Sequence, residues 1–116
     1  MAPIYIGSSL VPDQIIDSYL NEMVDQYLQT GEIPSGCPHG ECIGYDYGMF
    51  LYALTLRNHP TAKQVYDLTL KVVDETGVWC EYYHDGIAYS TRCRPWESAI
   101  NIESVLTYQE QNCKNR

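Results

Sequence analysis

The chain has 116 residues, which is the size of one domain or of one piece of a larger protein. Seven Lys and Arg residues against fifteen Asp and Glu residues give a formal net charge of -8. So acidic a chain has few cations for phosphate groups, which argues against nucleic acid or an anionic membrane surface as partner. Its hydrophobic content of 45% is that of a globular protein, and no apolar run is long enough to cross a bilayer.

The cysteines and the first residues bear on the cellular compartment. The five cysteines are an odd number, and residues 1–7 lack both the basic start and the apolar run of a secretory signal. Both features predict free thiols in a reducing, cytoplasmic setting, unless a missing upstream part carried the signal.

The first predicted element is an amphipathic helix. It begins at Pro12 and Asp13, because proline fits the first helical turn and an acidic residue there interacts favourably with the helix dipole. Apolar residues then recur as adjacent pairs at every fourth position up to Leu28 and form one broad stripe. Gly31 is expected to end the helix. The loop over 31–44 is rich in Gly and Pro, and loops this long are often functional.

Two further helices are predicted next. Residues 47–56 are apolar on nearly all sides, which predicts a helix buried all round. Residues 61–74 have apolar side chains at helical spacing and opposite charges four residues apart on the other face. This third helix therefore has one wet face, and Gly77 is expected to end it.

Residues 78–94 predict a β-hairpin or an irregular segment around the turn signal at 85–86. Pro95 then opens a fourth helix that is apolar as far as Leu106 and is predicted to be buried, while the polar residues 109–116 are predicted to fray. We therefore expect an all-α fold over 1–116, as a single domain or a fragment, with half-wet outer helices alternating with buried inner ones. Two buried helices need more cover than this chain supplies, which predicts self-association, a larger assembly or a missing remainder.

The segment after the third helix has residues suited to chemistry. Glu81 lies among Trp79, Tyr82 and Tyr83 in the sequence. Sugar-cleaving sites combine a carboxylate with aromatic rings, because rings stack on apolar sugar faces while the carboxylate transfers a proton. Partial burial by these rings tends to raise a carboxyl pKa. The alternative is a solvent-facing Glu81 in a hairpin whose aromatic residues belong to the core.

Three other residues have both a structural and a functional interpretation. Arg94 either forms an ordinary salt bridge or binds a substrate hydroxyl or carboxylate. Trp96, at the start of the fourth helix, is either a stacking platform or a core residue. Asp46 either caps the second helix, which contributes about 1 kcal/mol, or is a site acid at the mouth of that helix.

Two thiols and an imidazole lie close together in the loop, at Cys37, His39 and Cys42. They are able to begin a zinc site, but a tetrahedral site needs a fourth ligand and usually a second local pair. Cys80 and Cys93 are thirteen residues apart and form no such pair. A disulfide between Cys37 and Cys42 is an equal alternative, and we predict neither a metal nor another cofactor.

The segments GYDYG, GVWCEYYHDG and RPWESAINIE resemble the C-terminal end of an (α/α)6-toroid glycoside hydrolase. The likeness is to the clan that contains trehalase, the processing α-glucosidase and mannosylglycerate hydrolase. In that clan an aromatic-rich segment with a glutamate precedes an inner helix with a tryptophan. Residues 81–83 fall on the first motif and residues 95–99 on the second, and the resemblance covers about residues 11–108.

The resemblance implies the C-terminal part of a glycosidase that acts on carbohydrate by an inverting acid/base mechanism, with Glu81 as the general base. The implied substrate-binding residues are Trp79, Tyr82, Arg94, Trp96 and Asp46. The chain departs from the pattern, because residues 83–86 replace a tighter Tyr-Asp ending and the upstream aspartic acid has no counterpart. Only about two of the six helical hairpins are present, so the implied enzyme is incomplete alone and needs a complementary barrel chain.

The alternative function is a non-catalytic helical interaction or oligomerisation module, in which Glu81 is structural.

A geometric expectation follows from the toroid resemblance. The two inner helices run parallel in a toroid, with the third helix antiparallel between them, so Asp46, Glu81 and Trp96 are expected at one end of the helices, around one concavity.

Overall fold

A computed structural model describes residues 12–34, 42–73, 77, 79–80, 82–84, 87–88 and 95–114. The elements in chain order are α2 (Asp13–Thr30), β1 (Cys42–Ile43), α3 (Gly44–Leu56), α4 (Ala62–Lys71), β2 (Tyr82–His84), β3 (Ile87–Ala88) and α5 (Pro95–Lys114). The predicted all-α class is confirmed, because four helices form the body of the described residues and the strands are only two or three residues long.

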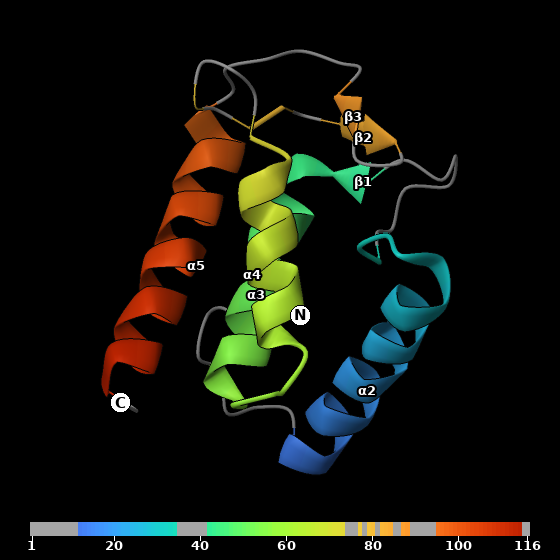
Figure 1. The fold of residues 1–116 in the computed structure, drawn as a ribbon. Helices are drawn as coiled ribbons and strands as arrows, with labels where there is room; N and C mark the ends of the chain where they lie inside the picture. Colours follow the sequence, from blue (N-terminus) through green and yellow to red (C-terminus); the bar gives the residue numbers. More distant parts are fainter. Residues whose placement is uncertain are drawn as a thin grey trace.

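The four helices alternate in direction (Figure 1). Helices α3 and α4 lie in the middle of the molecule, with α5 on one side and α2 on the other. Helices α3 and α5 therefore run parallel and begin at the same end, and α4 ends there. The expectation that the second and fourth helices share one end with the C-terminus of the third is confirmed for the helix directions.

Helix α3 forms the centre of the core. Phe50, Leu51, Ala53 and Leu54 have no exposed surface, as the apolar composition of residues 47–56 predicts. The helix begins earlier than predicted, at Gly44. It packs mainly on α5 and, less extensively, on α4.

Helix α2 begins and ends where the sequence predicts. Gly31 has a left-handed backbone with φ of 75°, and its N–H donates to the carbonyl of Tyr27 at 2.8 Å, which is a C-terminal cap. The buried stripe is narrower than predicted, since Ile16 and Leu20 are buried while their neighbours Ile15 and Tyr19 are more than half exposed.

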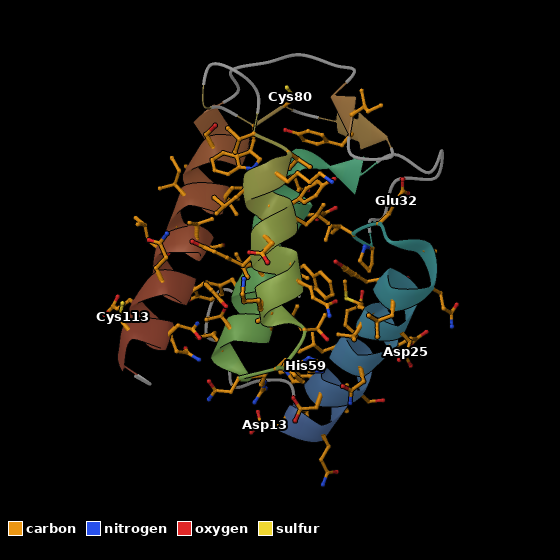
Figure 2. All side chains as sticks on the ribbon, in the orientation of Figure 1. Asp13, Asp25, Glu32, His59, Cys80 and Cys113 are labelled. Carbon is orange, nitrogen blue, oxygen red and sulfur yellow. The ribbon has the colours of Figure 1, made fainter. Side chains whose placement is uncertain are left out.

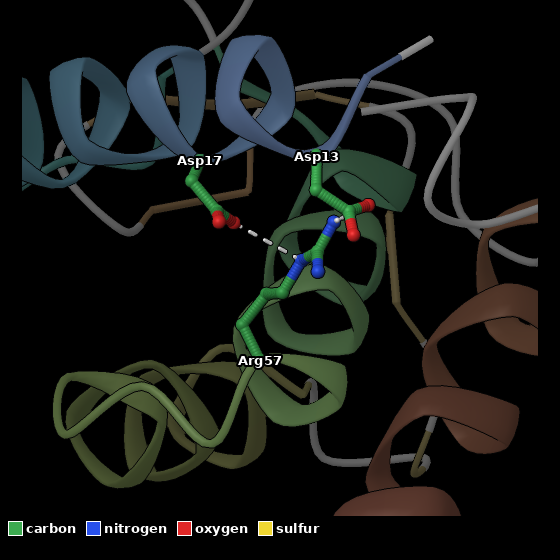
Figure 3. Close-up of polar contacts among 3 residues, drawn as sticks. All are labelled: Asp13, Asp17 and Arg57. Carbon is green, nitrogen blue, oxygen red and sulfur yellow. Dashed lines mark hydrogen bonds and ion pairs between the residues drawn. The ribbon is translucent and has the colours of Figure 1, made fainter. Parts of the chain in front are cut away.

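Two ion pairs hold the first turns of α2 against the turn that follows α3. Arg57 lies 3.2 Å from a carboxylate oxygen of Asp13 and 3.2 Å from one of Asp17 (Figure 3). The rings of Tyr27 and Phe50, 6.1 Å apart between centroids, join the other half of α2 to α3.

The strands form one small antiparallel sheet in the order β1-β2-β3. In β2 and β3, Tyr83 pairs with Ala88 and His84 with Ile87, which confirms the predicted hairpin in its described residues. Strand β1, which adds a third strand to this hairpin, was not predicted. Its Cys42 pairs with Tyr83 and its Ile43 with Tyr82. A strand of two residues has no alternating pattern that a sequence reveals.

Helix α5 differs from its prediction in two ways. It is not buried all round, because Ile102 and Leu106 are 48% and 57% exposed. It also continues through the polar stretch that was expected to fray. There, Gln111 Nε2 donates to the Thr55 carbonyl at 2.6 Å, and Gln109 Nε2 donates to the Tyr66 hydroxyl at 2.8 Å. These hydrogen bonds to α3 and α4 hold a segment that has little apolar surface of its own.

Candidate functional site

The predicted site belongs to the end of the molecule where α3 and α5 begin and α4 ends (Figure 1). Asp46 is in the first turn of α3, Trp79 follows α4, and Trp96 is the second residue of α5. Glu81 and Arg94 lie outside the described residues, as do the side chains of Tyr82 and Trp96. The backbone of Tyr82 lies there as well, because Tyr82 pairs with Ile43 directly before α3. The structure therefore brings four of the six residues to this end by their backbone positions.

Trp79 is a core residue, and its prediction as a sugar-stacking platform needs correction. Its side chain is 5% exposed, and its indole Nε1 donates to the carbonyl of Thr69 at 2.9 Å. Its backbone N–H donates to Ser98 Oγ at 3.4 Å, so Trp79 joins the end of α4 to the start of α5. A stacking platform needs an exposed ring face, which Trp79 does not have here.

Tyr83 is also part of the core. Its hydroxyl accepts from the N–H of Cys80 at 2.7 Å and donates to the carbonyl of Val72 at 3.1 Å. The ring contacts that of Tyr47 edge-on, with centroids 5.2 Å apart. For Trp79 and Tyr83, the structure thus fits the alternative in which the aromatic residues around Glu81 pack inward.

Asp46 is half-buried in the first turn of α3. The partial positive charge of a helix N-terminus favours an ionised carboxylate at such a position. This placement suits a capping residue and a site acid equally, so both interpretations of Asp46 stay predictions.

Two hollows are lined by described residues. The larger, of about 460 Å³, lies at the end of the molecule to which the predicted site belongs, because its lining includes the ends of α2 and α4, Tyr47 near the start of α3 and Ile87 of β3. None of the six predicted site residues lines it, and its only carboxylate is that of Glu32. The smaller, of about 180 Å³, is lined at the other end of α3 and α5 and has no carboxylate. An inverting glycosidase needs two carboxyl groups across its substrate, so neither hollow meets that need with its lining residues.

Cys37 and His39 of the possible zinc site lie outside the described residues. Within the described part, no three His, Cys, Asp or Glu side chains gather to hold a metal ion. Cys80 is a buried thiol, and Cys113 is an exposed one at the opposite end of the molecule (Figure 2). None of the described helices is long and apolar enough to span a membrane.

One buried amide bridges α3 and α5. Asn101 has no exposed surface; its Oδ1 accepts from the N–H of Gly48 at 2.8 Å, and its Nδ2 donates to the carbonyl of Gly44 at 2.9 Å. A Cβ atom added at Gly48 would lie 2.9 Å from the Cα of Asn101. The two helices therefore meet at a distance that only glycine permits.

The outer side of α5 has a row of residues that we name the α5 seam. Its members are Ala99, Ile102, Leu106, Gln109 and Cys113, and all of them are exposed. They alternate at spacings of three and four residues, which is the repeat of coiled-coil contact positions. The row extends for about 21 Å at the helical rise of 1.5 Å per residue. Within the row, Gln109 also reaches α4, because its Nε2 donates to the Tyr66 hydroxyl at 2.8 Å.

Helix α5 is rotated so that some polar side chains are buried and some apolar side chains are exposed, which is the opposite of what its composition predicts. The polar residues Asn101 and Ser104 have no exposed surface, while Ile102 and Leu106 face outward. The apolar composition up to Leu106 predicted burial for all apolar residues of this helix and gave no sign of an exposed row. The three-four spacing of Ala99, Ile102 and Leu106 was the signal that distinguishes a second contact face.

The chain matches no protein-family model, no curated protein and no solved structure.

Proposed function

We propose that the chain is a non-catalytic helical interaction module that binds another helical protein along α5. The α5 seam is the observation that supports this function. A single exposed leucine needs no explanation, since much of any protein surface is apolar. An exposed row at coiled-coil spacing over about four helical turns is a contact face without its partner.

A partner helix would gain binding free energy from the apolar area that it removes from water. Full burial of a Leu or Ile side chain contributes about 1.5–3 kcal/mol. Ile102 and Leu106 retain about half of that surface in the chain alone. Covering both with a facing helix is thus expected to contribute about 2 kcal/mol before the smaller residues of the seam are counted.

The test is binding of a fluorescent apolar dye to the chain and to a double variant, Ile102→Gln with Leu106→Gln. Glutamine has nearly the helix propensity of leucine, so α5 is expected to stay helical. We expect the double variant to lose most of the dye fluorescence while its urea midpoint stays unchanged. The matched control is Ile15→Gln with Leu28→Gln on α2, where both residues are 59% exposed. A chain that binds no dye, or equal losses in both variants, contradicts the proposal.

A second candidate function is the C-terminal part of an inverting glycoside hydrolase that acts on carbohydrate and needs a complementary barrel chain. The shared end of α3 and α5, with α4 running antiparallel to both, supports it, because the toroid resemblance implies these helix directions. The burial of Trp79 and Tyr83 weighs against it.

For this second candidate, we expect the chain alone to hydrolyse no aryl glycoside. Inversion requires two carboxyl groups about 6.5–9.5 Å apart, and only Glu81 has an assigned role. Turnover that Glu81→Gln abolishes, with unfolding unchanged, would instead establish a complete hydrolase and displace the interaction module as the main function.

A further inference from the structure

We propose that the larger hollow, of about 460 Å³, binds a small zwitterion with an apolar body, such as an apolar α-amino acid. The hollow is separate from the α5 seam, so this site goes beyond the proposed interaction function and does not depend on it. Its volume lies within the range of about 300–1,000 Å³ that is usual for small-molecule sites. The chemical class of the ligand follows from an apolar wall and from two opposite charges in the lining.

The apolar wall comes from two elements. Leu68 lies in the last turn of α4, Val72 follows that helix directly, and Ile87 belongs to β3. Ile87 is 69% exposed, so it has apolar surface that a ligand would remove from water. Small-molecule sites typically combine such a wall with a few polar groups that fix the orientation of the ligand.

Lys71 brings a positive charge to the hollow. Of the other cationic side chains that the structure describes, Arg57 forms ion pairs with two aspartates of α2, and Lys63 forms one with Asp67. Lys71 has no acidic partner within the described part of the chain, and it is exposed. Its ammonium group is therefore able to bind a carboxylate of a ligand in a charge-assisted hydrogen bond.

Glu32 brings a negative charge to the same hollow. Gly31 ends α2, and Thr30 Oγ1 accepts from the N–H of Glu32 at 3.1 Å, which holds this residue just past the helix (Figure 2). Glu32 takes part in a further interaction as well. An ionised carboxylate has about four acceptor positions, so the ammonium group of a ligand can join the contacts that Glu32 already makes.

The two charges together favour a zwitterion over a simple ion. Glu32 and Lys71 line one hollow, yet no ion pair joins them to each other. A simple anion would meet the Glu32 carboxylate and the partially negative C-terminal ends of α2 and α4. A simple cation would meet the ammonium group of Lys71. A ligand that has both an ammonium group and a carboxylate is able to contact both residues without either repulsion.

The experiment titrates four probes into the full chain at neutral pH, with isothermal titration calorimetry as the readout. The first probe is L-phenylalanine. The others are phenylpropionate, which lacks its ammonium group, phenylethylamine, which lacks its carboxylate, and glycine, which lacks its apolar body. We expect L-phenylalanine to bind with a Kd of about 1 mM or lower. Each of the other three is expected to bind at least about tenfold more weakly.

Charge-removing variants test the two residues. Lys71→Met keeps an unbranched side chain with high helix propensity, and we expect it to weaken L-phenylalanine at least about tenfold without weakening phenylethylamine. Lys63→Met changes the net charge equally on the same helix and is expected to change nothing. Glu32→Gln is expected to weaken L-phenylalanine without weakening phenylpropionate, with Glu22→Gln on the exposed side of α2 as its control. Thermal unfolding shows whether each variant is folded, and the four probes test the parent chain without any variant.

Backbone amide NMR shifts locate the site. We expect L-phenylalanine to shift the amides of Gly31 and Val72, and to leave unchanged that of Asn58, which lines the smaller hollow. The proposal is overturned by any of four results: no binding of L-phenylalanine, equal binding of the analogues that have one charge, shifts centred on Asn58, or binding that neither Lys71→Met nor Glu32→Gln weakens. The dye test of the α5 seam decides the interaction function separately.

Discussion

The side-chain amide of Asn101 hydrogen-bonds two buried backbone groups of α3, which an apolar side chain of similar size could not do. Its two polar atoms satisfy a backbone donor at Gly48 and a backbone acceptor at Gly44, inside the contact of α3 with α5. Buried polar groups are costly unless they are hydrogen-bonded, and this amide has a partner for each of its two polar atoms. The position opposite Asn101 must in turn be free of a side chain, which explains glycine at 48.

We therefore predict that Gly48→Ala lowers the free energy of unfolding by about 2–3 kcal/mol, because overpacking forces neighbours to move. The added methyl group would meet the Oδ1 and the Cα of Asn101, and the Cα is a backbone atom that no side-chain rotation can move. Gly31→Ala is the comparison, since nothing lies within 4 Å of the added Cβ and only the left-handed φ of 75° opposes it. That variant is expected to lose about 1 kcal/mol. Urea unfolding measures both, and a smaller loss for Gly48→Ala would contradict the tight helix contact.

At the scale of elements, α2 contacts the rest of the chain through surface ion pairs and through buried apolar side chains. Arg57, at the turn after α3, bridges Asp13 and Asp17 on successive turns of α2 (Figure 3). The carboxylates are at least half exposed, so water and salt weaken their attraction. The apolar side chains of α2, rather than these ion pairs, hold it against α3.

For this reason we expect Arg57→Ala to lower the free energy of unfolding by only about 0.5–1 kcal/mol, and by less near 1 M salt. Leu20→Ala, at a fully buried position of the same helix, is expected to cost about 2–5 kcal/mol at any salt concentration. Urea unfolding at two salt concentrations measures these losses. A loss at Arg57 that equals the loss at Leu20 would show that the ion pairs dominate the docking of α2.

The elements that the sequence predicted well are those with local causes. The apolar run of α3 and the glycine that ends α2 need no distant partner, and both were predicted from neighbouring residues. The orientation of α5 depends on Gly48, 53 residues away, so no local pattern contains it. The burial of Trp79 depends in the same way on the carbonyl of Thr69 and on the start of α5. The candidate site therefore stays a prediction, and the inward direction of the Trp79 and Tyr83 rings is the part that local sequence could not supply.

At the scale of the whole molecule, net charge and tyrosine content determine the response to alkaline pH. The chain is already at -8 with its eleven tyrosines neutral, and each ionised tyrosine adds repulsion. Tyr27 is a special case, because burial and, secondarily, the nearby Asp67 carboxylate raise the pKa of its hydroxyl above the usual 10.0. The folded chain thus holds this proton more tightly than the unfolded chain does.

The sign of the effect follows from proton linkage. A raised pKa in the folded state contributes stability that is complete below the unfolded pKa near 10.0 and is lost as pH rises through the folded pKa. We expect Tyr27→Phe to lose less stability than the parent chain between about pH 9 and 11. Thermal unfolding across this range measures it, and parallel pH profiles for the two chains would contradict the prediction. Tyr19→Phe, at an exposed position of the same helix, is the control.

The bridge from Asn101 has a further consequence for how the chain reaches its fold. Gly44 and Gly48 are the only partners of the amide that the structure describes, so α5 has one axial position along α3. Sliding by one helical turn, about 5.4 Å, would leave the amide facing side chains instead of backbone groups. Because this contact closes loops of more than fifty residues, correct seating of α5 is expected late in folding, after α2, α3 and α4 have associated.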